Sequence, residues 1–429
     1  MIHTIRLIVV AALLLSINVK AQVAYFPPLL GATWDTLSPQ RFAYQPNRID
    51  SLYSFLEQKN TKAFLLLRDG KIVLERYFGA FTRDSLWQWA SAGKTITSMA
   101  IGIAQQDRRL SIDATSSSIM GNGWTSEPLA KEQLITVRNQ LTMTSGLDDG
   151  VPESACTTPA CLLYKADAGT RWAYHNAPYT LLDSVIERST GQSLNQFVGQ
   201  RIRNRIGMGG QFVKVHYDNV YFSTPRGMAR FGLLMLNRGT WKTTPVLTDT
   251  AYYRQMVNSS NPLNLSYGYL WWLNGKASYR QPGTQFITQG PLTPNAPADM
   301  HSAMGKDGQL LCVVPSKKMV VVRMGKRPDL SNGAAVSIGF ANDMWKYIRL
   351  LTGTVRVQPV SQSVAPRVWP NPTSGKLTLD GICGIATLHD LEGRKCLTIS
   401  GNEADLTDLP NGVYYLTQTN GHRLQVIKW

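Results

Sequence analysis

Two strand hairpins that lie far apart along the chain constrain the fold most. FLLLRDGKIVLERYF, from Phe64, predicts two strands about the Asp69–Gly70 turn. Much later, Gln309–Val314 and Met319–Met324 predict a second hairpin. Between and beside them, apolar residues at three-to-four spacing predict helices over Arg48–Asn60, Thr95–Gln106, Tyr179–Thr190 and Asp343–Leu351. We therefore expect an α+β fold, in which distant segments build an antiparallel sheet with flanking helices and a helical lobe.

The length of 429 residues exceeds what one hydrophobic core usually organises, so a main domain with a smaller appendage is expected. The stretch TVRVQPVSQSV, from Thr354, loses all periodicity and is typical of a linker. Beyond it, the short alternating runs KLTLDG, GIATLHD, GVYYLTQ and RLQVIKW predict a small β-sandwich. The expected division is 1–21, an export signal; 22–353, the main domain; 354–365, a linker; and 366–429, the sandwich.

The first residues have the pattern of a secretory signal peptide. Arg6 precedes an apolar run from Leu7 to Ile17, and Val19-Lys20-Ala21 suits cleavage by a signal peptidase. The run is shorter than the roughly 20 residues that cross a bilayer. No cysteine directly follows the expected cleavage point, so we expect an exported protein without an N-terminal lipid anchor.

Export would place the five cysteines in an oxidising compartment. Cys156 and Cys161, in ACTTPAC, are spaced to close a small loop, and we predict a disulfide between them. Cys312 lies in an apolar run and is expected to be a buried free thiol, whereas Cys383 and Cys396 either pair or stay free. No spacing of cysteine and histidine predicts a metal site, and no organic cofactor is expected.

The formal net charge is +16, and its location decides how it is interpreted. The segment 366–429 holds six basic and six acidic residues, so the whole excess lies upstream. A basic exported body could attract anionic lipopolysaccharide or acidic substrates, or it could only aid solubility. No run of Lys or Arg with interleaved aromatic residues indicates nucleic acid as a partner.

The candidate nucleophile stands at the start of an apolar helix. Ser91 and Lys94 immediately precede ITSMAIGIA, and side chains three positions apart on a helix lie on one face, roughly 5 to 6 Å apart at Cβ. The positive end of the helix dipole favours an anion there. A serine hydroxyl needs an adjacent base, which a desolvated lysine can supply. The same pattern also fits an ordinary helix cap.

Tyr174-His175-Asn176 forms the second candidate element. It lies between a turn and a predicted helix, where loops often carry active-site residues. A phenol near a lysine ammonium can act as a base and later as an acid, and the Asn176 amide can orient a substrate carbonyl. The alternative is that Tyr174 is only a packing aromatic residue.

Together these motifs resemble the class C serine β-lactamases, the esterases related to them and the aminohexanoate-oligomer hydrolases. The resemblance covers about Ala43 to Leu351 and rests also on ITVRNQLTMTSGLDDG, AGTRWAYHNAPYTLLDSVIERSTGQS, RGMARFGLLMLNRGTW and YGYLWWLNG. It implies a β-lactamase/transpeptidase-like fold. It also implies that Ser91 is acylated, that Lys94 and Tyr174 activate it, and that Asn176 helps to bind the substrate.

The third motif of this family, Lys-Thr-Gly on an edge strand, is absent. The corresponding stretch, His301–Gln309, reads HSAMGKDGQ, in which we predict that Gly305 and Lys306 contact the substrate. A strand backbone can still donate an oxyanion N–H. The missing lysine ordinarily meets the β-lactam carboxylate, so the chain resembles the aminohexanoate-hydrolase and esterase branches more closely. His301 is either a substitute polar contact or, as we favour, a structural histidine.

The tail resembles a different family. VWPNPTSGKLTLDG, DLEGRKCL, DLTDLPNGVYYL and the closing VIKW are similar to the C-terminal sorting domain of the type IX secretion system in Bacteroidetes. The resemblance implies transport across both membranes by that machinery, removal of the tail, and release or attachment at the cell surface. A small sugar-binding sandwich is the alternative.

The sequence as a whole predicts a secreted serine hydrolase that acts on a small ester, amide or short peptide. Two alternatives stay open: a D-alanyl peptidase that binds β-lactams, and a catalytically silent surface binding protein.

Overall fold

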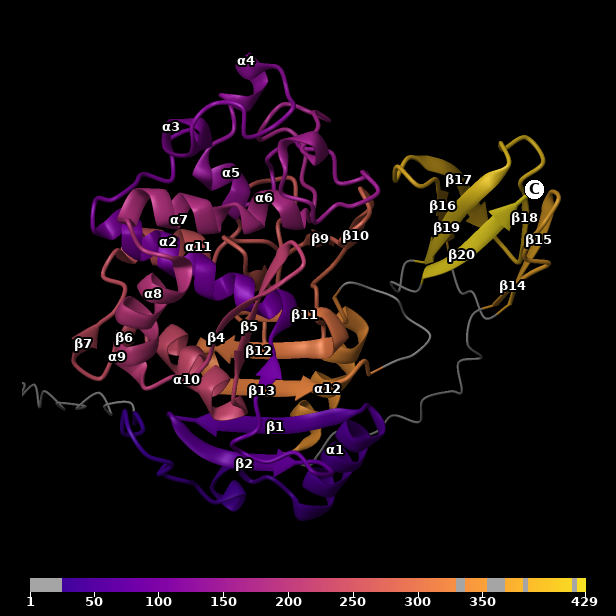
Figure 1. Cartoon of the computed structure of the whole chain (residues 1–429). Coiled ribbons are helices and arrows are strands. Elements are labelled where there is room, and N and C mark those ends of the chain that lie inside the picture. The colour runs from indigo at the N-terminus through magenta and orange to yellow at the C-terminus, as the bar shows by residue number, and fades with distance from the viewer. Residues whose placement is uncertain (1–24, 329–335, 353–366, 381–384, 419–422) are drawn as a thin grey trace, which may run out of the picture.

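The fold is described from a computed structural model of the chain (Figure 1). The description covers residues 25–328, 336–352, 367–380, 385–418 and 423–429. The expected export signal, the linker and Cys383 therefore lie outside the described residues. Among the helices described, none combines the length and apolar character that crossing a bilayer requires.

A six-stranded antiparallel sheet forms the centre of the main body, and the two predicted hairpins meet in it as expected. The strand order is β2-β1-β13-β12-β11-β8. Leu65 of the first hairpin pairs with Val322 of the second, so strands from the beginning and the end of the main body are neighbours in the sheet. The strands are β1 Thr61–Arg68, β2 Lys71–Tyr77, β8 Trp272–Leu273, β11 His301–Gly305, β12 Gln309–Val314 and β13 Met319–Gly325.

Helices cover both faces of this sheet. Helix α10 (Pro225–Leu236) packs so closely on one face that a Cβ at Gly232 would lie 2.6 Å from the side chains of Leu311 and Val320. Helices α1 (Pro46–Gln58) and α12 (Ile338–Leu350) pack against each other on the other side. Successive strand residues point to opposite faces, which is why β13 can serve both layers.

The helical lobe surrounds α2 (Lys94–Gln106), the helix that follows Ser91. Eleven of its 13 residues are buried, so it is a core helix rather than an amphipathic surface helix. The helix expected over Tyr179–Thr190 is divided at Leu181 into two helices. The other helices of the lobe are α3 Ser116–Met120, α4 Leu129–Glu132, α5 Val137–Leu141, α6 Asn176–Thr180, α7 Leu182–Thr190, α8 Leu194–Val198, α9 Asn204–Ile206 and α11 Thr250–Met256.

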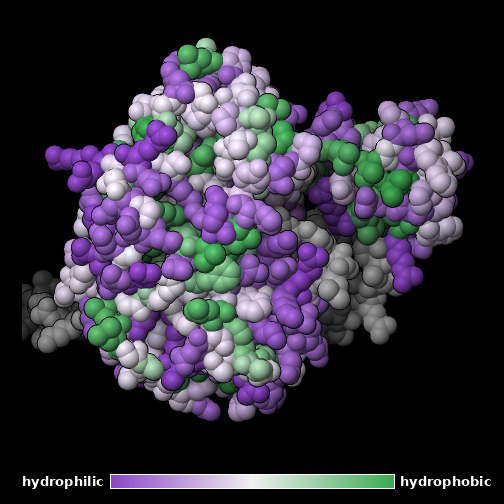
Figure 2. All heavy atoms as spheres, in the orientation of Figure 1, coloured by the Kyte–Doolittle hydropathy of each residue, from purple (hydrophilic) through white to green (hydrophobic). Residues whose placement is uncertain are grey.

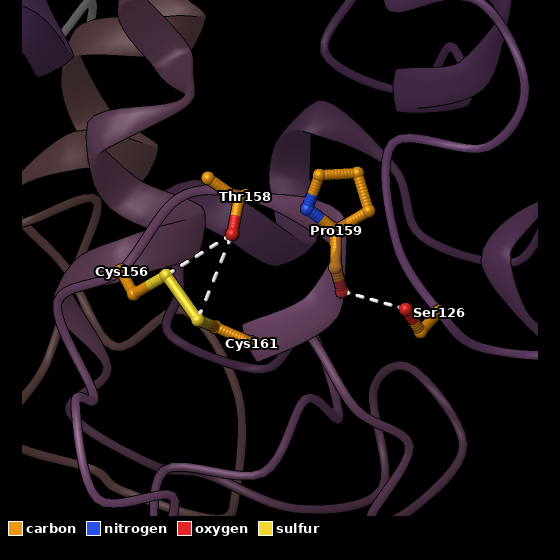
Figure 3. The surroundings of a disulfide bond; sticks show 5 residues. All are labelled: Ser126, Cys156, Thr158, Pro159 and Cys161. Atoms are coloured by element: carbon orange, nitrogen blue, oxygen red, sulfur yellow. Dashed lines mark hydrogen bonds between the residues drawn. A yellow bond between two sulfur atoms is a disulfide. The ribbon is translucent and has the colours of Figure 1, made fainter.

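The predicted disulfide between Cys156 and Cys161 is confirmed, with Cα atoms 5.8 Å apart (Figure 3). The Thr158 hydroxyl lies 3.2 Å from one sulfur and 3.7 Å from the other. Ser126 donates a hydrogen bond of 2.8 Å to the Pro159 carbonyl, which ties this loop to the preceding segment. Cys312 is buried and free, as expected, and Cys396 is also free.

A second, smaller sheet lies beside the start of α2. It contains β3 Trp87–Gln88, β4 Gln211–Val215 and β5 Asp218–Ser223 in the order β3-β5-β4. Leu86 and Val213 line a shallow groove of about 540 Å³, and both side chains are exposed. Figure 2 shows apolar surface near the middle of the face of the molecule that it draws. β3 leads directly into the turn that carries Ser91, so Leu86, which lines the groove, shortly precedes the candidate nucleophile in the sequence.

The C-terminal strands form a separate unit with its own core, the small β-sandwich that the sequence predicts. One sheet has the order β14-β15-β18 and the other β17-β16-β19-β20. Leu379, Leu388 and Val426 are among the residues buried in this core. The strands are β14 Arg367–Trp369, β15 Lys376–Asp380, β16 Ile385–His389, β17 Lys395–Ser400, β18 Glu403–Asp405, β19 Gly412–Gln418 and β20 Arg423–Lys428.

Phe286 links this unit to the main body. It precedes β10 (Ile287–Gln289), which pairs with β9 (Ser278–Arg280) in a hairpin. Its ring centroid lies 4.9 Å from that of His389, and the guanidinium carbon of Arg423 lies 4.6 Å from its centre. The backbone of Gln285 and Phe286 also lies close to Gly393, so the contact is made by the β9–β10 hairpin rather than through a shared core.

The packing of α2 predicts that Gly102→Ala destabilises the protein by about 1–3 kcal/mol, as overpacked core substitutions do. A Cβ at Gly102 would lie 2.3 Å from the Tyr252 ring, which is itself held by a 2.7 Å hydrogen bond from its hydroxyl to the Ser98 carbonyl. Gly339→Ala, on α12, is the matched control, because a Cβ there meets nothing within 4 Å. Thermal and denaturant unfolding of both variants measures the difference. Equal stability of the two would show that the α2 packing is misdescribed.

Candidate active site

The turn that carries Ser91 is tightly constrained. The 3-10 helix η2 (Ala90–Gly93) leads directly into α2, and Ala90 has φ of 47°, a left-handed conformation that is costly for a residue with a side chain. On the other side, a Cβ at Gly305 would lie 2.4 Å from the Trp89 carbonyl oxygen and 3.0 Å from the Ala92 nitrogen. The end of β11 and the start of α2 are therefore in direct backbone contact, which only glycine at position 305 permits.

Lys94 is buried at the first position of α2, with 4% of its surface exposed. Its Nζ lies 3.9 Å from the ring centroid of Tyr179 and 5.6 Å from that of Tyr174. Burial lowers the pKa of Lys94 to about 8, although the nearby carboxylates of Asp218 and Asp183 act in the opposite direction. The ammonium form therefore still predominates at neutral pH, although burial makes it less favoured than in an exposed lysine.

Tyr174 lies just before α6, within a group of aromatic rings. It stacks on Trp272 at 5.8 Å between centroids, makes an edge contact with Tyr267 and lies at a tilt to Trp172. Burial raises the pKa of Tyr174 above its ordinary value, while its hydrogen bond with Ser91 acts to lower it. The phenol is thus protonated at rest, and it can ionise only with help from a nearby positive charge.

Asn176 begins α6 two residues after Tyr174. Its Oδ1 is buried and has no hydrogen-bond partner within the described residues. Buried polar atoms in proteins are nearly always paired, so an unpaired amide oxygen beside this tyrosine is available to a bound molecule.

The backbone of β11 presents a further donor at the sheet edge. The Asn274 N–H donates a 2.9 Å hydrogen bond to the Met300 carbonyl, so the N–H groups of Ser302 and Met304 point to the same edge by the alternation of a strand. Ser302 pairs with Trp272 of β8, which ends there. The N–H of Met304, next to Gly305, is therefore the candidate for the second oxyanion donor.

The other residues of the third-motif region are placed differently. His301 is buried, its ring centroid lies 5.2 Å from that of Trp271, and burial lowers its pKa to about 4, so the imidazole is neutral. Lys306 is exposed in the turn η5 (Lys306–Gly308) between β11 and β12. Ser91, Lys94 and Tyr174 are thus brought together, whereas Lys306 lies at the surface beyond the strand end.

The sequence motifs do not indicate three residues near Lys94: Tyr179, Asp183 and Asp218. Tyr179 follows Tyr174 by five positions, and its spacing predicts only a helix. Asp183 interrupts the apolar spacing of TLLDSVI, which was the one available signal. Their significance depends on the packing of α6, α7 and β5 around α2, which local sequence does not contain. Within the described ranges, no group of three or more His, Cys, Asp or Glu side chains is placed to hold a metal ion.

The sheet, the buried helix and the serine at its start define a serine hydrolase of the β-lactamase fold. A family model described as beta-lactamase matches residues 56–339, and the chain belongs to this family.

Several proteins are similar over most of their length. An uncharacterised protein of Alkalihalophilus pseudofirmus is 21% identical over 299 residues, which cover 60% of this chain and 81% of that protein. A structure from Bacillus anthracis, provisionally named a 6-aminohexanoate-dimer hydrolase, has a TM-score of 0.57 at 20% identity and covers 76% of this chain and 89% of its own. EstA from Arthrobacter nitroguajacolicus Rue61a has a TM-score of 0.53 at 16% identity, with 75% and 99% covered. At these identities the structures establish the fold.

Proposed function

We propose that the protein is an exported serine hydrolase that cleaves an ester or amide bond through an acyl-enzyme on Ser91. One observation carries the proposal: Lys94 is buried, has a lowered pKa, and lies beside Tyr174, whose hydroxyl bonds to Ser91 at the start of α2. A capping serine with no catalytic role would not need a buried lysine and a partly buried phenol around it.

The proposed reaction has two proton transfers in each half. In the reactive form of the enzyme, Tyr174 has lost its proton to solvent, and the Lys94 ammonium stabilises the phenolate. The Ser91 hydroxyl attacks the substrate carbonyl and passes its proton to this phenolate. The N–H groups of Ser91 and Met304 stabilise the oxyanion. Tyr174 then protonates the leaving group as the carbon–oxygen or carbon–nitrogen bond breaks. Water, deprotonated by the same tyrosine, releases the acid and restores Ser91.

The substrate is proposed to be a small ester or a linear amide rather than a β-lactam. The similar structures include the provisionally named 6-aminohexanoate-dimer hydrolase and a family VIII carboxylesterase. In addition, β11 supplies no buried lysine to meet a β-lactam carboxylate, because Lys306 is exposed in the turn. A D-alanyl peptidase and a silent binding protein are the remaining alternatives.

The C-terminal unit is proposed to serve secretion. It has its own core, contains none of the candidate catalytic residues and balances its charges, whereas the main body carries the positive excess. These features suit a detachable type IX sorting domain in a protein that carries an export signal and is released or attached at the cell surface. The basic main body would then contact anionic lipopolysaccharide there. The matching host would be a member of the Bacteroidetes.

We expect Ser91→Ala to abolish both turnover and labelling by a fluorophosphonate, because the covalent bond needs the hydroxyl. Lys94→Ala and Tyr174→Phe should each reduce kcat by a large and similar factor. Residues of one proton-transfer unit are not additive, so the double variant should lose about as much as either single one. Circular dichroism controls for folding. Losses that multiply in the double variant would contradict the shared unit, and an unlabelled wild-type protein would support the silent binding protein.

The absent lysine predicts poor turnover of β-lactams. A charged hydrogen bond to a carboxylate contributes about 1.5–3 kcal/mol, so its loss should lower kcat/KM for a cephalosporin by about one to two orders of magnitude relative to short acyl esters. A panel of acyl esters, linear amide oligomers, D-alanyl peptides and a chromogenic cephalosporin measures this. A cephalosporin kcat/KM equal to that of the best ester would contradict the assignment.

A truncated protein that ends at Gly353 should fold and hydrolyse its substrate normally, because the two cores share no residue. In the native host, the same truncation should retain the enzyme in the periplasm. Activity of the purified protein and cell fractionation test the two halves separately. Loss of activity would show that the contact at Phe286 supports the site, and arrival at the cell surface would contradict the sorting role.

A further inference from the structure

The surroundings of Lys94 contain more than its presumed catalytic partners. Its Nζ lies closer to the ring of Tyr179, at 3.9 Å from the centroid, than to the ring of Tyr174, at 5.6 Å. Tyr179 has only 2% of its surface exposed. An ammonium over an aromatic face is attracted by the ring quadrupole, and the attraction is strongest where water is excluded. The Tyr179 ring therefore supplies a site for a cation, not only apolar packing.

Tyr179 is held in this position by its own helix, α6, and by a contact with α2. It belongs to α6, of which four residues are buried, and its hydroxyl lies 3.4 Å from the Thr97 hydroxyl, one turn along α2 from Lys94. Burial raises the pKa of Tyr179 well above its ordinary value, so the phenol stays neutral and attracts the cation through the quadrupole of its ring rather than through a formal charge.

Two partly buried carboxyl groups lie on elements that pack around this lysine, because α7 packs against α2 and β5 packs against η2 at the start of α2. Asp183 lies on α7, where it accepts a hydrogen bond from the Asn219 side chain, and its other oxygen has no partner within the described residues. Asp218, at the start of β5, likewise has an unpartnered buried oxygen. Both negative charges act on Lys94 and oppose the effect of its burial.

The charge of Asp183 is itself balanced by its neighbours. Burial raises the pKa of Asp183 to about 7, while Asn219, Lys214 on β4 and Lys94 lower it, and Glu187 on α7 raises it. The carboxylate form therefore predominates above neutral pH, where the Lys94 ammonium would otherwise begin to lose its proton.

We propose that Tyr179 is a positioning residue whose ring face holds the Lys94 ammonium, and that the negative charge of Asp183 keeps this lysine protonated while Ser91 is acylated. The inference rests on the proposed function, since it assigns Lys94 the role of a cation beside Tyr174 rather than that of a neutral base. The described hydrogen bonds of Tyr179 and Asp183 are made with Thr97 and Asn219 and not with Ser91, so we infer that both residues act through Lys94.

The first test separates the ring of Tyr179 from its hydroxyl. Tyr179→Phe keeps the ring and should retain kcat within about threefold, whereas Tyr179→Leu removes the ring and should lower kcat by at least about tenfold with little change in KM. Thermal unfolding identifies variants that are merely unstable. Equal activity of the leucine variant and the wild type would overturn the role of the ring. An equal loss in both variants would assign the effect to the hydroxyl instead.

The second test concerns charge. Asp183→Asn removes a negative charge that raises the pKa of Lys94, so the ammonium should be lost at a lower pH. The alkaline limb of the kcat/KM profile for a neutral ester should then move down by about one pH unit. Glu57→Gln, which removes an exposed carboxylate on α1, is the control and should leave the profile unchanged. An unchanged alkaline limb in Asp183→Asn, or a faster reaction at acidic pH, would overturn the ammonium role.

A third measurement does not depend on turnover. In the Ser91→Ala protein, nuclear magnetic resonance of nitrogen-labelled lysine should report a lower pKa for Lys94 when Asp183→Asn is added, and an unchanged value would contradict the inference. If the wild-type protein neither hydrolyses esters nor reacts with a fluorophosphonate, the proposed function fails while this titration still decides the electrostatic inference.

Discussion

The burial of one cation at the start of α2 is the constraint on which the site depends. An ammonium removed from water is very costly unless partners replace its hydration. Here Lys94 forms no close ion pair within the described residues, and its compensation is distributed: an aromatic face on α6 and carboxyl groups on α7 and β5. A direct salt bridge would satisfy the charge more fully, but it would also weaken the positive field that the ammonium exerts on Tyr174. The helical lobe can be understood as the structure that makes this compromise possible.

The parts of the fold that depend on local pattern were accessible from the sequence. Alternating strands and their turns placed β12 and β13 within a residue of their actual ends, and the cysteine spacing identified the disulfide. Helix ends were less accurate. The last helix begins at Ile338, five residues before the expected Asp343, because its first turn is buried through contacts that only the fold creates.

The candidate site divides in the same way. Ser91, Lys94 and Tyr174 belong to motifs with recognisable neighbouring residues, so their spacing and the family resemblance could predict them as catalytic residues. The sequence predicts Gly305 as a substrate contact, yet the contact that constrains this residue in the structure is with the backbone around η2. Asp183 carried only the weak signal of a charge on an apolar helix face. Whether a charge is buried, and what it faces, follows from the packing of several helices, and no single segment encodes it.

The contact at Phe286 means that removal of the C-terminal unit would change the surface of the main body. While the C-terminal unit is attached, this aromatic ring lies against His389 and Arg423. Proteolytic maturation of the kind proposed would uncover this ring, next to the exposed Ile287, on the β9–β10 hairpin. The same hairpin bonds through the Gln285 side chain to the Trp172 carbonyl, beside the aromatic group around Tyr174. The precursor and the mature enzyme would thus differ in exposed aromatic surface on a hairpin that is hydrogen-bonded to the aromatic group around Tyr174. An antibody or dye that recognises exposed aromatic groups could distinguish the two forms.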